Sequence, residues 1–157
     1  KDLKWLSSHE EDLGGTLIIY NQGFVGARVK SLLSKEVKEE PFKLPPLIFS
    51  FLNSFYPGNS LKAVALLHRL AATEPTEKIM HFLGRHLRDL YWVSQDPGLL
   101  PYQEDWRVLK NLTQAKKFKK DGLEQTIGQL AEADVLSKTS DTQAIGLLDQ
   151  IIVTQLE

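Results

Sequence analysis

Residues 60–95 read SLKAVALLHRLAATEPTEKIMHFLGRHLRDLYWVSQ, and this stretch predicts two consecutive helices. In residues 61–71, apolar side chains cover almost the whole circumference and leave only a thin face of Lys62 and Arg69. A helix of that kind lies at the centre of a bundle or in an interface. In the second part, apolar residues recur every three or four positions, which is typical of an amphipathic helix. Pro75 separates the two helices because proline cannot continue one.

The same periodicity continues on both sides of this stretch and predicts a mainly α fold. Ser60, Thr76 and Asp121 are candidate helix caps, and Glu124 gives Asp121 the spacing of a capping box. We expect a bundle of about six helices, preceded by a short strand and helix, with one helical domain at residues 44–157. The expected helices are Pro46–Tyr56, Ser60–Thr73, Thr76–Ser94, Glu104–Lys119, Asp121–Thr139 and Thr142–Leu156.

Residues 1–43 do not share this pattern. Thr16-Leu17-Ile18-Ile19-Tyr20 is rich in β-branched and aromatic side chains, which favours a short buried strand. A helix from about Val25 to Ser34 and a charged connector ending at Lys43 are expected after it. A single strand cannot satisfy its own backbone hydrogen bonds. We therefore expect it to pair with a partner chain or with a sheet upstream of this sequence.

The composition sets limits on the protein class. A chain of 157 residues has room for one domain with a core, or for one domain and a remnant of another. With 19 basic and 20 acidic residues, any contact with nucleic acid must be local. The absence of cysteine excludes disulfides, thiolate metal sites and thiol nucleophiles.

Targeting signals are not evident either. The first eleven residues carry charges throughout, unlike a signal peptide, and no stretch approaches the roughly 18 apolar residues of a membrane span. We expect a soluble, cytoplasmic protein. Because the sequence begins with lysine instead of methionine, it is consistent with a piece of a longer chain.

The helix expected at Thr76–Ser94 has a second, basic face. A basic stripe that ends in an indole fits phosphate or the acidic surface of a partner. The alternative is a solvated face whose charges are partly matched by Glu77 and Asp89. The stripe consists of Lys78, His81, Arg85, Arg88 and Trp92.

The next helix carries the most basic part of the chain. Such clusters attract phosphate backbones, but lysines at the C-terminal end of a helix also complement its dipole. A contact with DNA or with an acidic partner and an ordinary structural use are both open. The residues are Arg107, Lys110, Lys116, Lys117, Lys119 and Lys120.

The helix expected at 121–139 carries an acid–base pair. Leu123, Ile127 and Leu130 define an apolar stripe whose next members are Asp134 and Lys138. Residues four apart on a helix can pair, and a partly buried pair is costly to break by removing one member. The spacing predicts an orienting contact in a packed interface. Catalysis is the weaker interpretation because the pair lacks a third group.

No other motif indicates chemistry. The four histidines are scattered without the spacing of a shared metal face. The glycines near residue 25, with Lys30 beyond, lack the Gly-Lys-Ser/Thr ending of a phosphate-binding loop. We expect no catalytic residue, metal or cofactor.

Several short motifs follow one another along the chain, and their order resembles one family. They are Phe49-Ser50-Phe51-Leu52-Asn53, Lys62-Ala63-Val64-Ala65-Leu66-Leu67, Glu74-Pro75, Arg85 with Arg88, Trp106 to Phe118, and Leu130-Ala131-Glu132-Ala133-Asp134 running on to Lys138-Thr139. In this order they resemble the C-terminal helical collar domain of the delta subunit of the bacterial DNA polymerase III clamp loader. Residues 16–42 are similar to the late strand and helix of that family's nucleotide-fold domain, so residues 1–43 would be a remnant of it.

The resemblance implies a non-catalytic subunit whose link to DNA polymerase activity comes through the holoenzyme. Its partners would be delta-prime and gamma or tau type ATPases, which load the sliding clamp onto primed DNA. The part of the family that grips the clamp has no counterpart in this chain. The alternative is a free-standing helical module that binds nucleic acid or protein. Residues expected to orient the interface are Arg85, Arg88, Trp106, Asp134 and Lys138.

Overall fold

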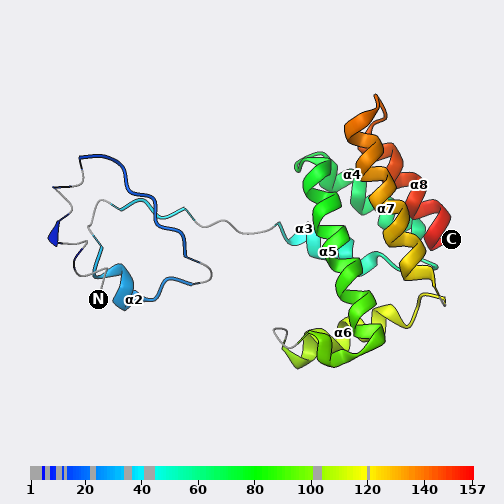
Figure 1. Cartoon of the computed structure of the whole chain (residues 1–157), viewed down its shortest axis with the longest axis horizontal. Coiled ribbons are helices and arrows are strands. Elements are labelled where there is room, and N and C mark those ends of the chain that lie inside the picture. Colours follow the sequence, from blue (N-terminus) through cyan, green and yellow to red (C-terminus); the bar gives the residue numbers. More distant parts are fainter. Residues whose placement is uncertain are drawn as a thin grey trace. The chain divides into compact units, whose positions relative to one another are not determined.

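The computed structural model describes residues 5, 8–9, 12, 14–21, 24–33, 37–40, 45–100, 104–119 and 121–157. The chain divides into two compact units, Lys1–Lys43 and Leu44–Glu157, which are described separately (Figure 1). This division falls where the change in sequence pattern places it. None of the described residues is in a β-strand.

The first unit corrects the prediction of a strand. Residues 16–20 are extended but unpaired and exposed, with Ile18 87% and Tyr20 85% accessible to solvent. The β-branched composition was not enough because no neighbouring strand supplies hydrogen bonds or cover. Helix α2 spans Ala27–Lys30, which is shorter than predicted, and Ser34 lies outside the described residues. The strand–helix remnant of a nucleotide fold is therefore not supported.

The second unit confirms the prediction of a helical bundle. Proline and glycine turns separate its elements much as the sequence indicates, although α6 ends four residues before the predicted Lys119. In the described residues of this unit the elements are α3 (Pro46–Ser54), α4 (Ser60–Ala71), α5 (Thr76–Gln95), the 3-10 turn η2 (Pro97–Leu99), α6 (Asp105–Ala115), α7 (Gly122–Thr139) and α8 (Ala144–Leu156).

Helix α5 is the centre of the bundle and packs against every other helix of this unit (Figure 1). Its core face is the amphipathic stripe of the sequence, and Ile79, Leu83 and Leu87 are buried. Helix α4 is less central than its composition predicts. It buries one face against α3, α5 and α8 but leaves Leu61 88% exposed.

The predicted helix caps are wrong. Neither α4, α5 nor α7 has a side-chain hydrogen bond at its N-cap. Asp121 has φ = 64°, in the left-handed region, whereas a capping side chain requires extended backbone. Glu124 does not complete a capping box, because its carboxylate accepts a hydrogen bond from the Tyr91 hydroxyl at 3.3 Å. That contact joins α5 to α7.

The core stripe of α7 also differs from the prediction. The fully buried residues are Leu123, Thr126, Leu130 and Ala133, and Ile127 is partly buried and packs against the core as predicted. Asp134 departs from the predicted stripe, since its side chain is 45% exposed. Thr126 can be buried because its hydroxyl donates to the Gly122 carbonyl at 2.7 Å.

The end of α8 closes the bundle against the turn between α3 and α4. The Gly58 amide donates to the Leu156 carbonyl at 2.6 Å. Gly58 has φ = 83°, a conformation that favours glycine. Among the described residues, no helix has both the length and the hydropathy needed to cross a bilayer.

Candidate functional surfaces

One face of α6 presents an aromatic and basic strip. Trp106, Lys110, Thr113 and Lys117 are spaced by four, three and four residues, which aligns them along one side of the helix and the turn after it. All four are exposed, and Trp106 is 56% accessible. The Arg107 guanidinium lies 5.1 Å from the centroid of a Trp106 ring, which is a cation–π distance. We call these four residues the α6 strip.

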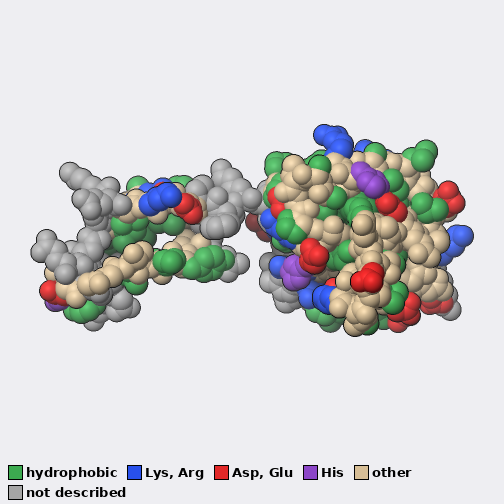
Figure 2. All heavy atoms as spheres, turned by 90° about the horizontal axis from the view of Figure 1, so that it is seen from above, with side chains coloured by type: hydrophobic (Ala, Val, Ile, Leu, Met, Phe, Trp, Pro, Cys, Tyr) green, Lys and Arg blue, Asp and Glu red, His purple; other side chains and the backbone are tan. Residues whose placement is uncertain are grey.

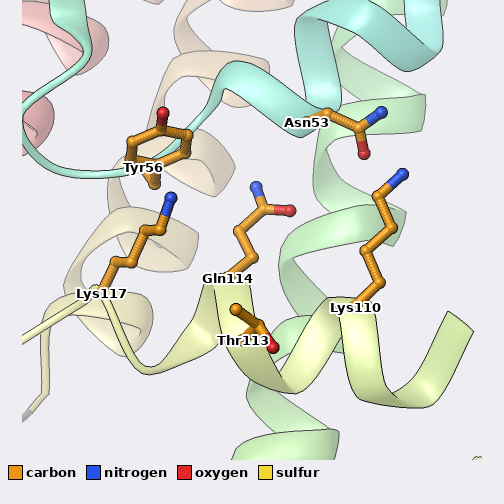
Figure 3. A pocket seen from close by; sticks show the side chains of 6 residues that line it. All are labelled: Asn53, Tyr56, Lys110, Thr113, Gln114 and Lys117. Atoms are coloured by element: carbon orange, nitrogen blue, oxygen red, sulfur yellow. The ribbon is translucent and has the colours of Figure 1, made fainter. Parts of the chain in front are cut away.

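A hollow of about 270 Å³ lies between the α6 strip and the end of α3 (Figure 3). Lys110 and Lys117 point into it from α6 and the turn beyond, towards Asn53 and Tyr56 (Figure 3). The Lys117 ammonium lies 3.4 Å from the centroid of the Tyr56 ring. No carboxylate lines the hollow, whose residues are Asn53, Tyr56, Lys110, Thr113, Gln114 and Lys117. Its lining therefore carries two positive charges and no negative charge.

The structure brings only part of the predicted basic cluster together. Lys110 and Lys117 share the hollow, whereas Arg107 lies against Trp106. Lys116 and Lys119 are exposed but do not line the hollow. The predicted Lys120 lies outside the described residues. On the face of the helical unit shown in Figure 2, basic and acidic side chains are interspersed.

A buried amide fixes the floor of the hollow. Gln114 donates through Nε2 to the Leu52 carbonyl at 2.8 Å and to the Phe55 carbonyl at 2.9 Å. Its Oε1 lies 3.2 Å from His86 Nε2. Because both amide protons are donated, His86 Nε2 must carry the proton of that hydrogen bond. Gln114 therefore ties α6 to both α3 and α5.

Burial controls the titration of His86. Desolvation lowers its pKa from 6.5 to about 4, and Lys110 contributes in the same direction. The hydrogen bond to Gln114 and the charge of Asp89 oppose the shift without cancelling it. His86 is consequently neutral at pH 7 and adds no charge beside the two lysines.

The basic face of α5 is partly neutralised by its own surroundings. Lys78 pairs with Glu74 at 2.6 Å, and not with Glu77. The Arg88 guanidinium lies 3.2 Å from the Asp89 carboxylate and 4.8 Å from a ring centroid of Trp92. Arg85 is exposed, and its side chain has no ion pair within the described residues. Most of this face therefore fits the interpretation as a solvated surface.

The acid–base pair on α7 forms as predicted, but at the surface. Lys138 Nζ lies 2.6 Å from Asp134 Oδ2, with the two side chains 62% and 45% exposed. The neighbouring Val135 and Leu136 are exposed as well. The C-terminal half of α7 thus combines uncovered apolar side chains with an ion pair that is already formed.

No known protein family, curated protein or solved structure matches the chain. No role is therefore carried over from a relative, and each surface is interpreted from its own geometry.

The described histidines and the Asp134–Lys138 pair lie at separate places in the helical unit and in residues 1–43. The described residues contain no cluster of three His, Asp or Glu side chains able to hold a metal ion. His68 pairs with Asp149 at 3.0 Å and links α4 to α8. Asp134 and Lys138 lie away from the hollow, whose lining includes neither.

The sequence indicated the two lysines of the hollow but not the hollow itself. The spacing of Trp106, Lys110, Thr113 and Lys117 on one helical face is visible in the sequence and could have singled out this strip. Asn53 lies on α3 and Tyr56 in the turn after it, more than fifty residues before the lysines of the hollow, and no local pattern links them to α6. Their contribution depends on tertiary packing.

Proposed function

We propose that the helical unit is an assembly domain of the clamp-loader delta type, which packs against delta-prime and gamma or tau type ATPase subunits. In this role the chain performs no bond chemistry. It contributes to a ring of subunits whose ATPase members load a sliding clamp onto DNA. The observation that carries the proposal is the uncovered C-terminal half of α7.

Val135 is 58% exposed and Leu136 is 46% exposed, on the helix that also holds the Asp134–Lys138 pair. In water, an exposed ion pair of this kind contributes only about 0.3–0.5 kcal/mol to stability. Its value would lie in orientation, because burial at an interface makes a mismatched charge costly. The apolar neighbours would supply the area that is buried on association.

The order of motifs supports the same proposal. Each motif from Phe49 to Thr139 that resembles the collar domain falls on or beside a helix of the bundle, in the family's order. Arg85 is exposed without an ion pair among the described residues, so it is free to contact a neighbouring subunit. Arg88 is already held by Asp89 and Trp92, which fits a local role better.

The test is to mix the purified chain with ATPase subunits of the same source and to measure complexes by native mass spectrometry. We expect a defined hetero-complex that Val135→Asp weakens at least tenfold. The matched control is Val37→Asp, which makes the same change at an exposed valine of the first unit. The proposal fails if no complex forms, or if the two variants assemble equally well.

A second candidate, a nucleic-acid-binding helical module, is favoured specifically by the α6 strip. Single-strand binding surfaces combine lysines or arginines that follow the backbone with aromatic rings that stack on bases. The strip has both components. A steep fall of oligonucleotide affinity with salt would support this candidate, and affinity independent of salt would contradict it.

A further inference from the structure

We infer that the hollow between α3 and α6 binds a backbone phosphate of single-stranded nucleic acid while Trp106 stacks on one of its bases. This inference rests on the second candidate function and does not depend on the assembly role. It assigns the contact to particular side chains, and it divides the α6 strip into a phosphate end and a base end.

The phosphate end is defined by two lysines without acidic partners. Neither Lys110 nor Lys117 forms an ion pair among the described residues, and no carboxylate lines the hollow between them. Lys110 lies on α6 and Lys117 in the turn after it, and both line the hollow. The Asn53 amide adds a neutral donor to the lining, whereas the Thr113 hydroxyl already donates to the Leu109 carbonyl at 2.8 Å. An anion entering the hollow would therefore meet donors from both helices.

The hollow is also held in shape before any ligand arrives. Lys117 is positioned over the Tyr56 ring, and the Gln114 amide fixes the floor through two carbonyls of α3. Side chains that are already ordered lose less entropy when they bind. Lys110, Thr113 and Lys117 are exposed, so this edge of the hollow is reachable from solvent.

Trp106 makes a single nucleic-acid strand the favoured ligand. An acidic peptide would satisfy the lysines but would offer the exposed indole no base to stack on. In a duplex the base faces are already stacked on one another, so they cannot reach the ring. An unpaired strand presents phosphates and free base faces together. The α6 strip offers lysines to the phosphates and an indole ring to a base.

Two carboxylates determine which end of the α6 strip meets a base and which meets phosphates. Glu104 accepts a hydrogen bond from the Trp106 indole N–H, and Asp105 is the next residue. Their negative charge disfavours a phosphate at that end of α6. A base should therefore meet the indole, and phosphates should lie towards Lys110 and Lys117.

The experiment measures binding of a fluorescein-labelled twelve-residue oligothymidylate to the full chain by anisotropy, between 50 and 200 mM salt. Lys110→Gln with Lys117→Gln should lower affinity at least tenfold and reduce the slope of log affinity against log salt by about 0.7, the contribution of the one phosphate that the hollow neutralises. Lys110→Arg with Lys117→Arg keeps the charges and should retain the slope. The matched control is Arg28→Gln with Arg69→Gln, two exposed arginines elsewhere, which should change affinity less than about threefold.

Trp106→Ala tests the base end. It should lower affinity by about 5-fold to 100-fold, the range found for loss of one base–aromatic stack, while leaving the salt slope unchanged. A parallel decrease of the slope would mean that Trp106 acts by holding the charged residues in place, and would contradict the assignment of a base contact.

Competitors separate the possible ligands. A single-stranded oligonucleotide should displace the probe more effectively than a hairpin duplex, polyglutamate or inorganic phosphate. If the duplex or polyglutamate competes equally well or better, the assignment to a single strand is overturned. If the chain binds the probe but the lysine pair is dispensable, this inference alone fails. If the chain does not bind the probe at all, the second candidate function fails with it.

Discussion

Gln114 is a polar side chain in a core position, and three hydrogen bonds account for its burial. We expect Gln114→Leu to lower the free energy of unfolding by about 1–3 kcal/mol, because the Phe55 carbonyl would remain buried without a donor and the Leu52 carbonyl would keep only the Phe55 amide. Urea unfolding followed by circular dichroism measures the change.

Gln125→Leu is the matched control for that substitution. Gln125 is exposed on α7, so the same change should alter the free energy of unfolding by no more than about 0.5 kcal/mol. Equal effects at the two positions would show that the amide network of Gln114 does not stabilise the bundle.

His86 gives the protein a defined dependence on pH. Its pKa is about 4 in the folded chain and 6.5 when exposed, so the unfolded state binds more protons between these values. Stability from this group is complete above about pH 6.5 and decreases as the pH falls towards 4, by up to about 3 kcal/mol. We expect the difference in unfolding free energy between the native chain and His86→Gln to shrink by that amount from pH 7 to pH 4. A difference independent of pH would contradict the burial of a neutral imidazole.

The sequence pattern predicted which charged side chains form a pair better than it predicted whether that pair is buried. The spacing of Asp134 and Lys138 correctly indicated a pair, since residues four apart meet on any helix. Whether the pair is buried depends on which face of α7 packs into the bundle, and that is set by tertiary contacts that the spacing does not reveal. The contacts of Gln114 were not predictable, because their partners lie about sixty residues away.

At the scale of elements, the packing of α5 on α7 depends on Gly84. A Cβ added there would lie 3.5 Å from a Leu130 methyl group, so there is room for alanine but not for a longer side chain. We expect Gly84→Ala to stabilise the chain by about 0.5–1 kcal/mol through helix propensity. Gly84→Leu should destabilise it by about 1–3 kcal/mol through overpacking. Thermal unfolding measures both.

Gly128 on α7 provides the comparison, since nothing lies within 4 Å of a Cβ placed there. Gly128→Leu should therefore not lower the midpoint of thermal unfolding. If Gly84→Leu is tolerated equally well, the two helices are not in the close contact described above.

Prolines and glycines explain why the helices were predictable and the strand was not. A proline or glycine ends a helix through local sterics, so Pro75 and the Pro57–Asn59 turn act wherever the segment lies. A strand requires a second strand, which is not a local property. Residues 16–20 have the composition of a strand but no partner among the described residues.

At the scale of the whole molecule, the core belongs entirely to the second unit. Among the described residues, every buried apolar side chain lies between Ile48 and Leu156. We expect a fragment of residues 45–157 to unfold cooperatively, with a midpoint within about 3 °C of that of the full chain. Differential scanning calorimetry makes the comparison. A fragment without a cooperative transition would show that the first unit contributes to the core.

The amide of Gln114 also specifies the register of α6. If α6 slipped by one turn, the Phe55 carbonyl would be buried without a donor and the Leu52 carbonyl would lose one of its two, so other placements of α6 are disfavoured. By fixing where α6 lies against α3, the Gln114 hydrogen bonds also set the depth of the adjacent hollow and the distance between the Lys110 and Lys117 ammonium groups. Substitutions that keep both lysines but loosen this register should lower the selectivity between ligands before they abolish binding.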